Sequence, residues 1–265
     1  MFCISPRQVA YLPKAEALAA FGYRVLVYDG FGRGFSDRLI DIPVSLDVLV
    51  RQLYDFLAAL QVKTPVVLYG TSLGAAIAAR FARVHPQCTL AVGFEAPLIR
   101  AYPAPKSAAL LRWPLLGQWL ARIVLVPKVI ARGEAIGVDA AGRLAARHFV
   151  EQFRVIGHEA DLVSIITGDA VHGNRLPDHA DIAQRGLPVH FAYALDDDEC
   201  PAQIVEEAIA LYRDPSVRTY KGGHFLEAPV EHFVEFLCSV PIDRGGSTRR
   251  SQPRRRRNTS PSAAR

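Results

Sequence analysis

Short apolar segments alternate with amphipathic segments along most of the chain, and this alternation constrains the fold more than any other feature. The apolar runs have the length and composition of strands that are buried on both faces of a sheet. Strands that alternate with helices form parallel crossovers, so we predict an α/β fold with a mostly parallel sheet and helices on both faces. The predicted strands are 23–28, 65–69, 89–94, 189–193 and 217–220, and the predicted helices are 9–21, 45–60, 73–84, 202–212 and 229–238.

One long segment interrupts this alternation. Residues 96–187 show no clear strand pattern, and we predict that they form a helical cap inserted into a core of residues 1–95 and 188–243. The cap contains an apolar stretch around Trp113 and Trp119. We interpret this stretch as packing between the cap and the sheet, and an acyl-binding wall or a lipid-facing lid is the alternative.

The charge of the chain belongs mainly to its carboxyl end. The formal net charge is +5, but eight arginines and no acidic residue lie between Arg244 and Arg265. Without them, 23 basic residues face 26 acidic ones, so the remainder has a net charge of −3. Residues 244–265 are predicted to form a disordered, arginine-rich tail, which we interpret as solvated rather than as a nucleic-acid-binding segment. The charge therefore gives no reason to expect nucleic acid as a partner of the folded part.

Cysteine usage and the absence of a targeting pattern bear on the compartment. The four cysteines show no paired spacing, so reduced thiols are expected. The first residues do not resemble a signal peptide, and the most apolar stretch contains prolines and charged residues that argue against a spanning helix. We expect a cytoplasmic protein without a transmembrane segment.

The strongest chemical signal is the sequence Gly70-Thr71-Ser72-Leu73-Gly74, which matches G-x-S-x-G. A predicted strand precedes the motif and a predicted alanine-rich helix follows it. A sharp turn between these elements crowds the backbone, so it requires glycines, and it presents Ser72 above the carboxyl edge of the sheet. We predict that Ser72 is a nucleophile and that the Leu73 N–H donates to an oxyanion. A chance match in an ordinary loop is the alternative.

A nucleophilic serine requires a base and an acid that orients the base. Among the eight histidines, His224 follows the last predicted strand, and the two glycines before it permit an unusual backbone path. The carboxyl ends of parallel strands lie at one edge of a sheet, so His224 is predicted to be the base. The acid is expected after the preceding strand, where residues 196–199 are all acidic. This order of serine, acid and histidine is typical of α/β-hydrolases.

Four segments together resemble the α/β-hydrolase family, in its branch of lipases, esterases and C–C hydrolases. The resemblance covers about residues 9–240, and the segments are 22–37, 70–74, 194–201 and 223–237. The spacing to Pro201 in the family's acid turn implies that Asp197 is the acid of the triad. Glu95, which directly follows the predicted strand 89–94, is an alternative, because some members of the family place the acid there.

The resemblance implies a serine hydrolase that acts on a small-molecule acyl or ester substrate, with a carboxylic ester as the first expectation. Hydrolysis of a C–C bond or an amide is an alternative within the class, and a catalytically silent binding protein is an alternative outside it. No cofactor is predicted, because residues 30–37 lack the third glycine of a dinucleotide-binding fingerprint. No metal is predicted either, because the histidines lack metal-ligand spacing.

The amino-terminal end departs from the family pattern. The family places its strands 1 to 3 and a His-Gly loop before the first helix, whereas this chain starts almost directly with a predicted helix. We therefore predict an N-terminally truncated fold without the central strand 3 and without the loop that supplies the second oxyanion donor. A shortened fold with direct pairing of the family's strands 4 and 5, or a non-catalytic relative, is the alternative.

Overall fold

The structure is a computed structural model that describes residues 2–5, 8–39, 42–100, 106–113, 115–135, 147, 150–154, 157–224 and 228–240. The predicted arginine-rich tail and Phe225 of the predicted histidine loop lie outside these residues. No helix in the described part of the chain is both long enough and apolar enough to cross a bilayer.

The sheet has six strands in the order β2-β1-β3-β4-β5-β6, and all neighbouring strands run parallel. The predicted α/β fold with a mostly parallel sheet is therefore confirmed. The strands are β1 (Phe2–Ser5), β2 (Leu26–Asp29), β3 (Val66–Thr71), β4 (Thr89–Glu95), β5 (Val189–Ala194) and β6 (Ser216–Tyr220).

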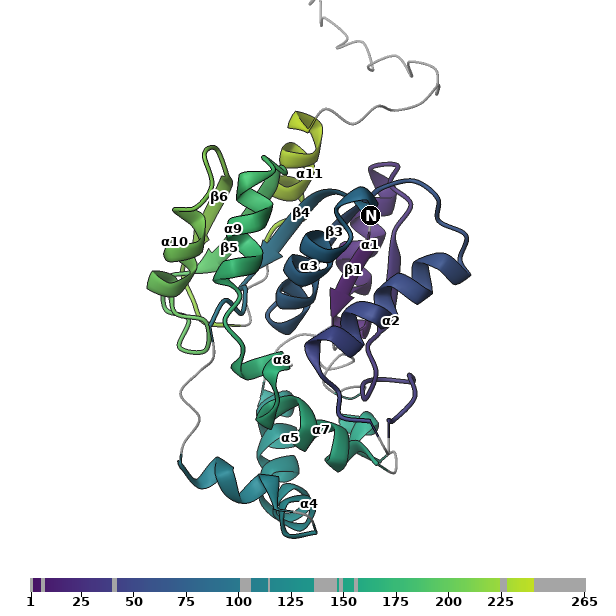
Figure 1. The fold of residues 1–265 in the computed structure, drawn as a ribbon, viewed down its shortest axis with the longest axis vertical. Helices are drawn as coiled ribbons and strands as arrows, with labels where there is room; N and C mark the ends of the chain where they lie inside the picture. The colour runs from purple at the N-terminus through teal and green to yellow at the C-terminus, as the bar shows by residue number, and fades with distance from the viewer. Residues whose placement is uncertain are drawn as a thin grey trace, which may run out of the picture.

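Helices cover both faces of this sheet (Figure 1). On one face, α3 packs between α2 and α9, and α10 packs against β5. On the other face, α1 packs against α11. The bounds are α1 (Gln8–Ala20), α2 (Leu46–Ala59), α3 (Leu73–Val84), α9 (Leu176–Gln184), α10 (Ala202–Ile209) and α11 (Val230–Ser239).

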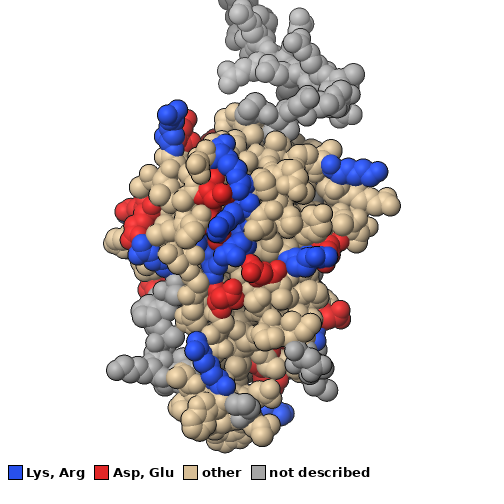
Figure 2. All heavy atoms as spheres, in the orientation of Figure 1, with Lys and Arg blue, Asp and Glu red and all other residues tan. Residues whose placement is uncertain are grey.

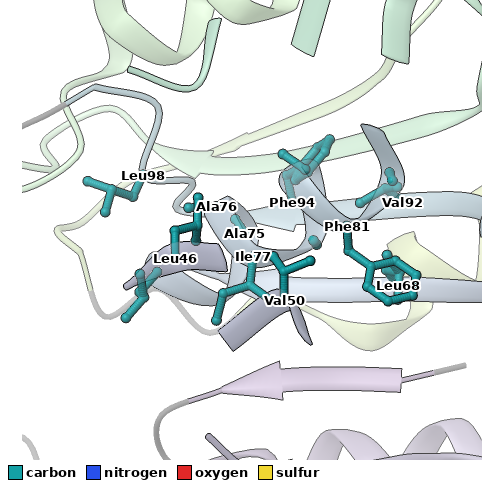
Figure 3. Packing of buried hydrophobic residues seen from close by; sticks show 14 of the residues in the cluster. Leu46, Val50, Leu68, Ala75, Ala76, Ile77, Phe81, Val92, Phe94 and Leu98 are labelled. Atoms are coloured by element: carbon teal, nitrogen blue, oxygen red, sulfur yellow. The ribbon is translucent and has the colours of Figure 1, made fainter. Parts of the chain in front are cut away.

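The two faces have separate hydrophobic cores, which follow from the alternation of side chains along a strand. In β3, Val66 and Leu68 point into the core beneath α2 and α3, whereas Val67 and Tyr69 point toward α1 and α11. Figure 3 shows the first core, where Val50 of α2 and Ile77 and Phe81 of α3 gather with side chains of the strands such as Leu68. The alanines of α3 bring this helix close to the sheet, which fixes the position of its amino-terminal end.

The prediction that the sheet lacks its central strand is wrong. The backbone of β1 pairs with both neighbours, since Phe2 lies beside Leu26 of β2 and Leu68 of β3. β1 thus occupies the position that the family's strand 3 would take, so direct pairing of β2 with β3 is also wrong. The apolar run of β1 covers only residues 2–4, shorter than the run over 23–28 that indicated β2, which is why the sequence pattern missed it. The predicted truncation of the amino terminus stays a prediction.

Between β4 and β5 the described residues are helical or irregular. The final helix of this segment, α9, belongs to the layer that covers the sheet, and its Ile182 is part of the core beneath α3. The other elements lie beyond the edge of the sheet, at the lower end of Figure 1. They are η2 (Lys106–Arg112), α4 (Leu116–Leu120), the π-helical turn η3 (Ala121–Leu125), α5 (Val126–Ala135), η4 (Gln152–Arg154), α7 (His158–Thr167) and α8 (Asp169–His172).

Candidate active site

Ser72 lies in a strained turn between β3 and α3. Its backbone has φ 52° and ψ −118°, a conformation with positive φ that residues other than glycine rarely adopt. The Ser72 N–H donates to the carbonyl oxygen of Glu95 at 3.0 Å, which ties the turn to the end of β4. A Cβ atom at Gly70 would lie 2.2 Å from the carbonyl oxygen of Gly74, so the turn can form only with glycine at position 70. The turn therefore holds the Ser72 side chain at the carboxyl edge of the sheet.

His224 reaches Ser72 from the loop that follows β6. Its Nε2 lies 3.0 Å from Ser72 Oγ, and its side chain is 7% exposed. The loop turns at Gly222, whose φ of 119° favours glycine, as the paired glycines in the sequence predicted. The structure thus brings together the predicted nucleophile and the predicted base, although 152 positions separate them in the sequence.

Asp197 holds the other nitrogen of His224. Its Oδ2 lies 3.0 Å from His224 Nδ1, and its Oδ1 accepts the backbone N–H groups of Glu199 and Cys200 at 2.8 and 2.9 Å. The backbone thus orients the carboxylate independently of His224. Of the other acidic residues in this loop, Asp196 accepts from the Gly222 N–H at 3.4 Å, and Glu199 Oε2 lies 3.8 Å from His224 Nε2. The spacing in the sequence therefore selected the residue that the structure places against Nδ1.

Burial and hydrogen bonding act on Asp197 in opposite directions. Burial favours the neutral acid, but the hydrogen bonds from His224 and from the backbone N–H groups of Cys200 and Glu199 favour the anion. The second influence prevails, so the pKa of Asp197 lies below its ordinary value. The carboxylate stays charged near neutral pH and can stabilise a protonated His224.

Cys200 is a neighbour of the serine that the sequence analysis missed. Its side chain is buried and interacts with Ser72, while burial and the charges of Asp197 and Glu199 raise the pKa of its thiol. The thiol therefore stays neutral and acts as a weak hydrogen-bonding group rather than as a nucleophile. Its position directly before Pro201, in the acid turn, is the only sequence signal that could have indicated it.

The same cluster is the one group of potential metal ligands in the described residues. One ligand atom each from Asp197, Cys200 and His224 lie within 4.8 Å of one another. The hydrogen bonds of Asp197 with His224 and with the Cys200 N–H already account for this closeness, so the arrangement gives no specific reason to expect a resident ion. The absence of a metal stays a prediction.

Glu95, the alternative acid, has a different set of contacts. Its carboxylate is 1% exposed and forms a hydrogen-bonded ion pair with Lys14 of α1. It also accepts the Thr71 hydroxyl at 2.8 Å and the Ala228 N–H at 3.2 Å. Glu95 therefore connects the residue before Ser72 with the segment after His224. Sequence reasoning did not find the roles of Lys14 and Thr71, because nothing in their local pattern signals a partner on β4.

Leu73 is the first residue of α3, so the helix itself leaves its N–H group unused. This N–H lies at the positive end of the helix dipole, next to Ser72, where negative charge would develop. In the family pattern the second donor follows the strand that β1 replaces here. Residues 6 and 7, which follow β1, lie outside the described part of the chain.

The glycine-rich turn after β2 has a structural explanation. A Cβ atom at Gly34 would lie 2.1 Å from the Asp29 carboxylate, and one at Gly32 would lie 2.7 Å from Asp161 Cβ. Asp29 in turn accepts the Phe35 N–H at 3.1 Å. These glycines thus permit close packing around Asp29 and Asp161. The absence of a dinucleotide site stays a prediction.

The sheet order, the strained serine turn and the contacts of His224 define the α/β-hydrolase class. A family model described as serine aminopeptidase, S33, matches residues 8–196, and the chain belongs to this family. A comparison with curated proteins gave no significant match.

Solved structures show the same fold at low sequence identity. A thermophilic esterase from Thermogutta terrifontis is 16% identical with a TM-score of 0.70, and the match covers 90% of this chain and 89% of that one. An enol-lactonase from Burkholderia xenovorans LB400 is 15% identical with a TM-score of 0.71, over 89% and 90% of the two chains. An N-formylmaleamic acid deformylase from Pseudomonas putida S16 is 21% identical with a TM-score of 0.63, over 89% and 90%. At these identities the likeness establishes the fold, which confirms the α/β-hydrolase architecture.

Proposed function

We propose that the chain is a serine hydrolase that cleaves a carboxylic ester through Ser72, His224 and Asp197. The observation that carries the proposal is the continuous line of hydrogen bonds from Ser72 Oγ to His224 Nε2 and from His224 Nδ1 to Asp197 Oδ2, each 3.0 Å long. This geometry suits nucleophilic catalysis, because the base is within reach of the hydroxyl proton and the acid fixes the base.

In the first half-reaction, Ser72 Oγ attacks the ester carbonyl carbon while His224 Nε2 accepts the hydroxyl proton. The carbonyl oxygen becomes an oxyanion that the Leu73 N–H stabilises. His224 is then an imidazolium, and its Nδ1–H donates to the charged Asp197. Collapse of the tetrahedral intermediate breaks the bond to the alcohol oxygen, which takes the proton from Nε2. An acyl group remains on Ser72 and an alcohol leaves.

In the second half-reaction, a water molecule takes the place of the alcohol. His224 Nε2 accepts a proton from this water, and the water oxygen attacks the acyl carbon. The second tetrahedral intermediate collapses with return of the proton to Ser72 Oγ, so a carboxylic acid leaves and the free serine is restored. His224 Nε2 thus accepts a proton and gives it back in both halves of the reaction.

A fluorophosphonate probe tests the nucleophile directly, because its phosphorus reacts with an activated serine whatever the natural acyl group is. We expect the folded protein to react with one equivalent of probe, and we expect Ser72→Ala to abolish the reaction. Ser239→Ala is a matched control, since the Ser239 hydroxyl lies on α11 and donates to the carbonyl oxygen of Phe236. It should react as the parent does.

Two outcomes would contradict the proposal. Reaction of the probe with Ser72→Ala would place the nucleophile elsewhere, and a folded protein that does not react would support a catalytically silent member of the family. For a reactive protein, a series of p-nitrophenyl esters of increasing chain length, compared with the matching anilides, would define the acyl group and separate ester from amide hydrolysis.

A further inference from the structure

A set of large apolar side chains lies exposed on the helical segment between β4 and β5. Trp113 is 63% exposed and Trp119 is 57% exposed, and these are both of the tryptophans in the chain. Their neighbours extend the surface, and we call the whole set the cap face. It comprises Leu110, Trp113, Leu115, Leu116, Trp119, Ile123 and Val124, which are between 36% and 82% exposed. The interpretation of this stretch as packing against the sheet is therefore wrong for these side chains.

The helix that carries most of the cap face has its large residues outside and its small residues inside. Helical backbone runs without a break from α4 through η3 into α5, and Gly117 and Ala121 are its buried positions within α4 and η3. A Cβ atom at Gly117 would lie 2.0 Å from the carbonyl oxygen of Leu111, so η2 contacts the helix at its smallest residue. Leu116, Trp119 and Ile123 follow at helical spacing on the exposed side. A helix of a water-surrounded monomer normally shows the reverse arrangement.

The surroundings of the cap face are cationic. No aspartate or glutamate occurs between Glu95 and Glu134, whereas this interval contains six lysines and arginines. Arg112, Arg122 and Lys128 are exposed on the same elements as the cap face. In the described part of the cap, Glu159 of α7 is an acidic neighbour, with its Oε1 4.0 Å from Arg122 Nε. On the face shown in Figure 2 the corresponding lower end of the molecule is mainly uncharged, with a few basic and acidic groups among the uncharged atoms.

We propose that the cap face docks on the surface of a bilayer that contains anionic lipid. Tryptophans prefer the boundary between lipid headgroups and acyl chains, and arginine and lysine beside them bind anionic headgroups. An amphipathic helix with this composition lies in the plane of the interface rather than across it. The proposal does not depend on the chemistry at Ser72.

A second copy of the chain is the competing occupant, and charge argues against it. Two copies would pair through the same surface, as in any twofold dimer, so a surface bordered by Arg122 and Lys128 would face another surface with the same cationic border. Such an interface would bring like charges together, with Glu159 as the acidic group described beside Arg122. Anionic lipid instead supplies the opposite charge over the whole surface.

The test measures binding of the full-length Ser72→Ala protein to vesicles of phosphatidylcholine with and without phosphatidylglycerol. Both tryptophans lie on the cap face, so the intrinsic tryptophan fluorescence reports on this surface alone. We expect the emission to shift to shorter wavelength with the anionic vesicles, and brominated lipid to quench it. Co-sedimentation with the vesicles gives the partition coefficient independently.

Two variants separate the apolar and the cationic contributions. Leu116→Gln with Ile123→Gln retains both tryptophans and should lower the partition coefficient about tenfold or more, because apolar surface no longer enters the interface. Arg122→Gln with Lys128→Gln should lower it about fivefold for each charge removed, and high salt should have the same effect on the parent protein. Leu60→Gln with Leu211→Gln is the matched control, since these leucines are 39% and 43% exposed in the turns after α2 and α10.

Three results would overturn the proposal. The first is a protein that does not bind the anionic vesicles, and the second is equal loss of binding in the cap-face and control variants. The third is a dimer in analytical ultracentrifugation that only the cap-face variant dissociates, which would assign this surface to a second copy of the chain.

Discussion

Replacement of Glu95 by glutamine tests whether one buried carboxylate holds both loops of the candidate active site. The Glu95 carboxylate accepts from Lys14, from the Thr71 hydroxyl and from the Ala228 N–H. Thr71 directly precedes Ser72, and Ala228 lies between His224 and α11. Loss of the charge should therefore affect the stability of the protein and the alignment of Ser72 with His224.

The structure sets the expected magnitude of the stability loss. Glutamine retains the size of Glu95 but leaves the Lys14 ammonium without its carboxylate, and the Lys14 side chain is only 20% exposed. Removal of one partner from a buried ion pair typically costs about 3–5 kcal/mol. Lys14 retains some contact with water, so we expect the free energy of unfolding to fall by about 2–3 kcal/mol.

A double-mutant cycle measured by urea unfolding isolates this pair from the rest of the network. Lys14→Met alone leaves the Glu95 carboxylate buried without its ion-pair partner, so it should also destabilise the protein. The double variant, Lys14→Met with Glu95→Gln, leaves neither charge of the pair. Its free energy of unfolding should exceed the value expected from the sum of the two single changes by about 2 kcal/mol, which is the coupling energy. The rate of reaction with the fluorophosphonate probe should fall about tenfold or more in Glu95→Gln, because small displacements of reacting groups slow a reaction strongly.

Additive changes in the cycle would refute the reasoning, as would a Glu95→Gln variant as stable as the parent. The exposed pair of Arg51 and Asp55 on α2 provides the control, because its side chains are 73% and 54% exposed. Asp55→Asn should leave both the free energy of unfolding and the rate of probe reaction unchanged.

Two further predictions follow from the backbone and from the buried histidines. Gly70→Ala should abolish the reaction with the probe, because its Cβ would lie 2.2 Å from the Gly74 carbonyl oxygen. An unchanged circular dichroism spectrum of the variant would show that the rest of the fold is retained. Burial lowers the pKa of His158 and His179 to about 3 and that of His190 to about 4, so all three are neutral in the folded protein. The unfolded chain takes up these protons below about pH 6.5, so stability should be constant above this pH and fall as the pH drops toward 4, by up to about 1.4 kcal/mol per pH unit for each histidine. Urea unfolding at pH 7.5, 6 and 5 measures this, and a free energy of unfolding that does not change over this range would contradict it.

The parts of the fold that the sequence predicted are those whose cause is local. The helix over 45–60 carries its own signal, since apolar residues recur at helical spacing and the Ser45 side chain accepts the Val48 N–H at its start. The serine turn is equally local, because the glycine at position 70 and the strain at Ser72 depend only on the strand and helix on either side.

The features that the sequence missed depend on residues far apart in the chain. The apolar run of β1 covers only residues 2–4, and the pairing of β1 with β2 and β3 decides its place. The ion pair between Lys14 and Glu95 joins positions that are 81 residues apart, and no local pattern distinguishes Lys14 from another lysine on a helix surface. The exposure of the cap face likewise cannot be predicted from the sequence, because the pattern of an apolar helix is the same whether its large residues face a core or solvent.

Asp197 combines a local and a distant cause, which explains why the sequence could select it only by resemblance. The four acidic residues of its loop are chemically similar, so composition alone cannot rank them. The local turn directs the Glu199 and Cys200 N–H groups to one oxygen of Asp197, and this fixes the carboxylate. The second oxygen then faces His224, which arrives from a separate strand. The spacing between Asp197 and Pro201 reflects the local turn and can be seen in the sequence. The contact with His224 depends on the pairing of β5 with β6, which the sequence does not show.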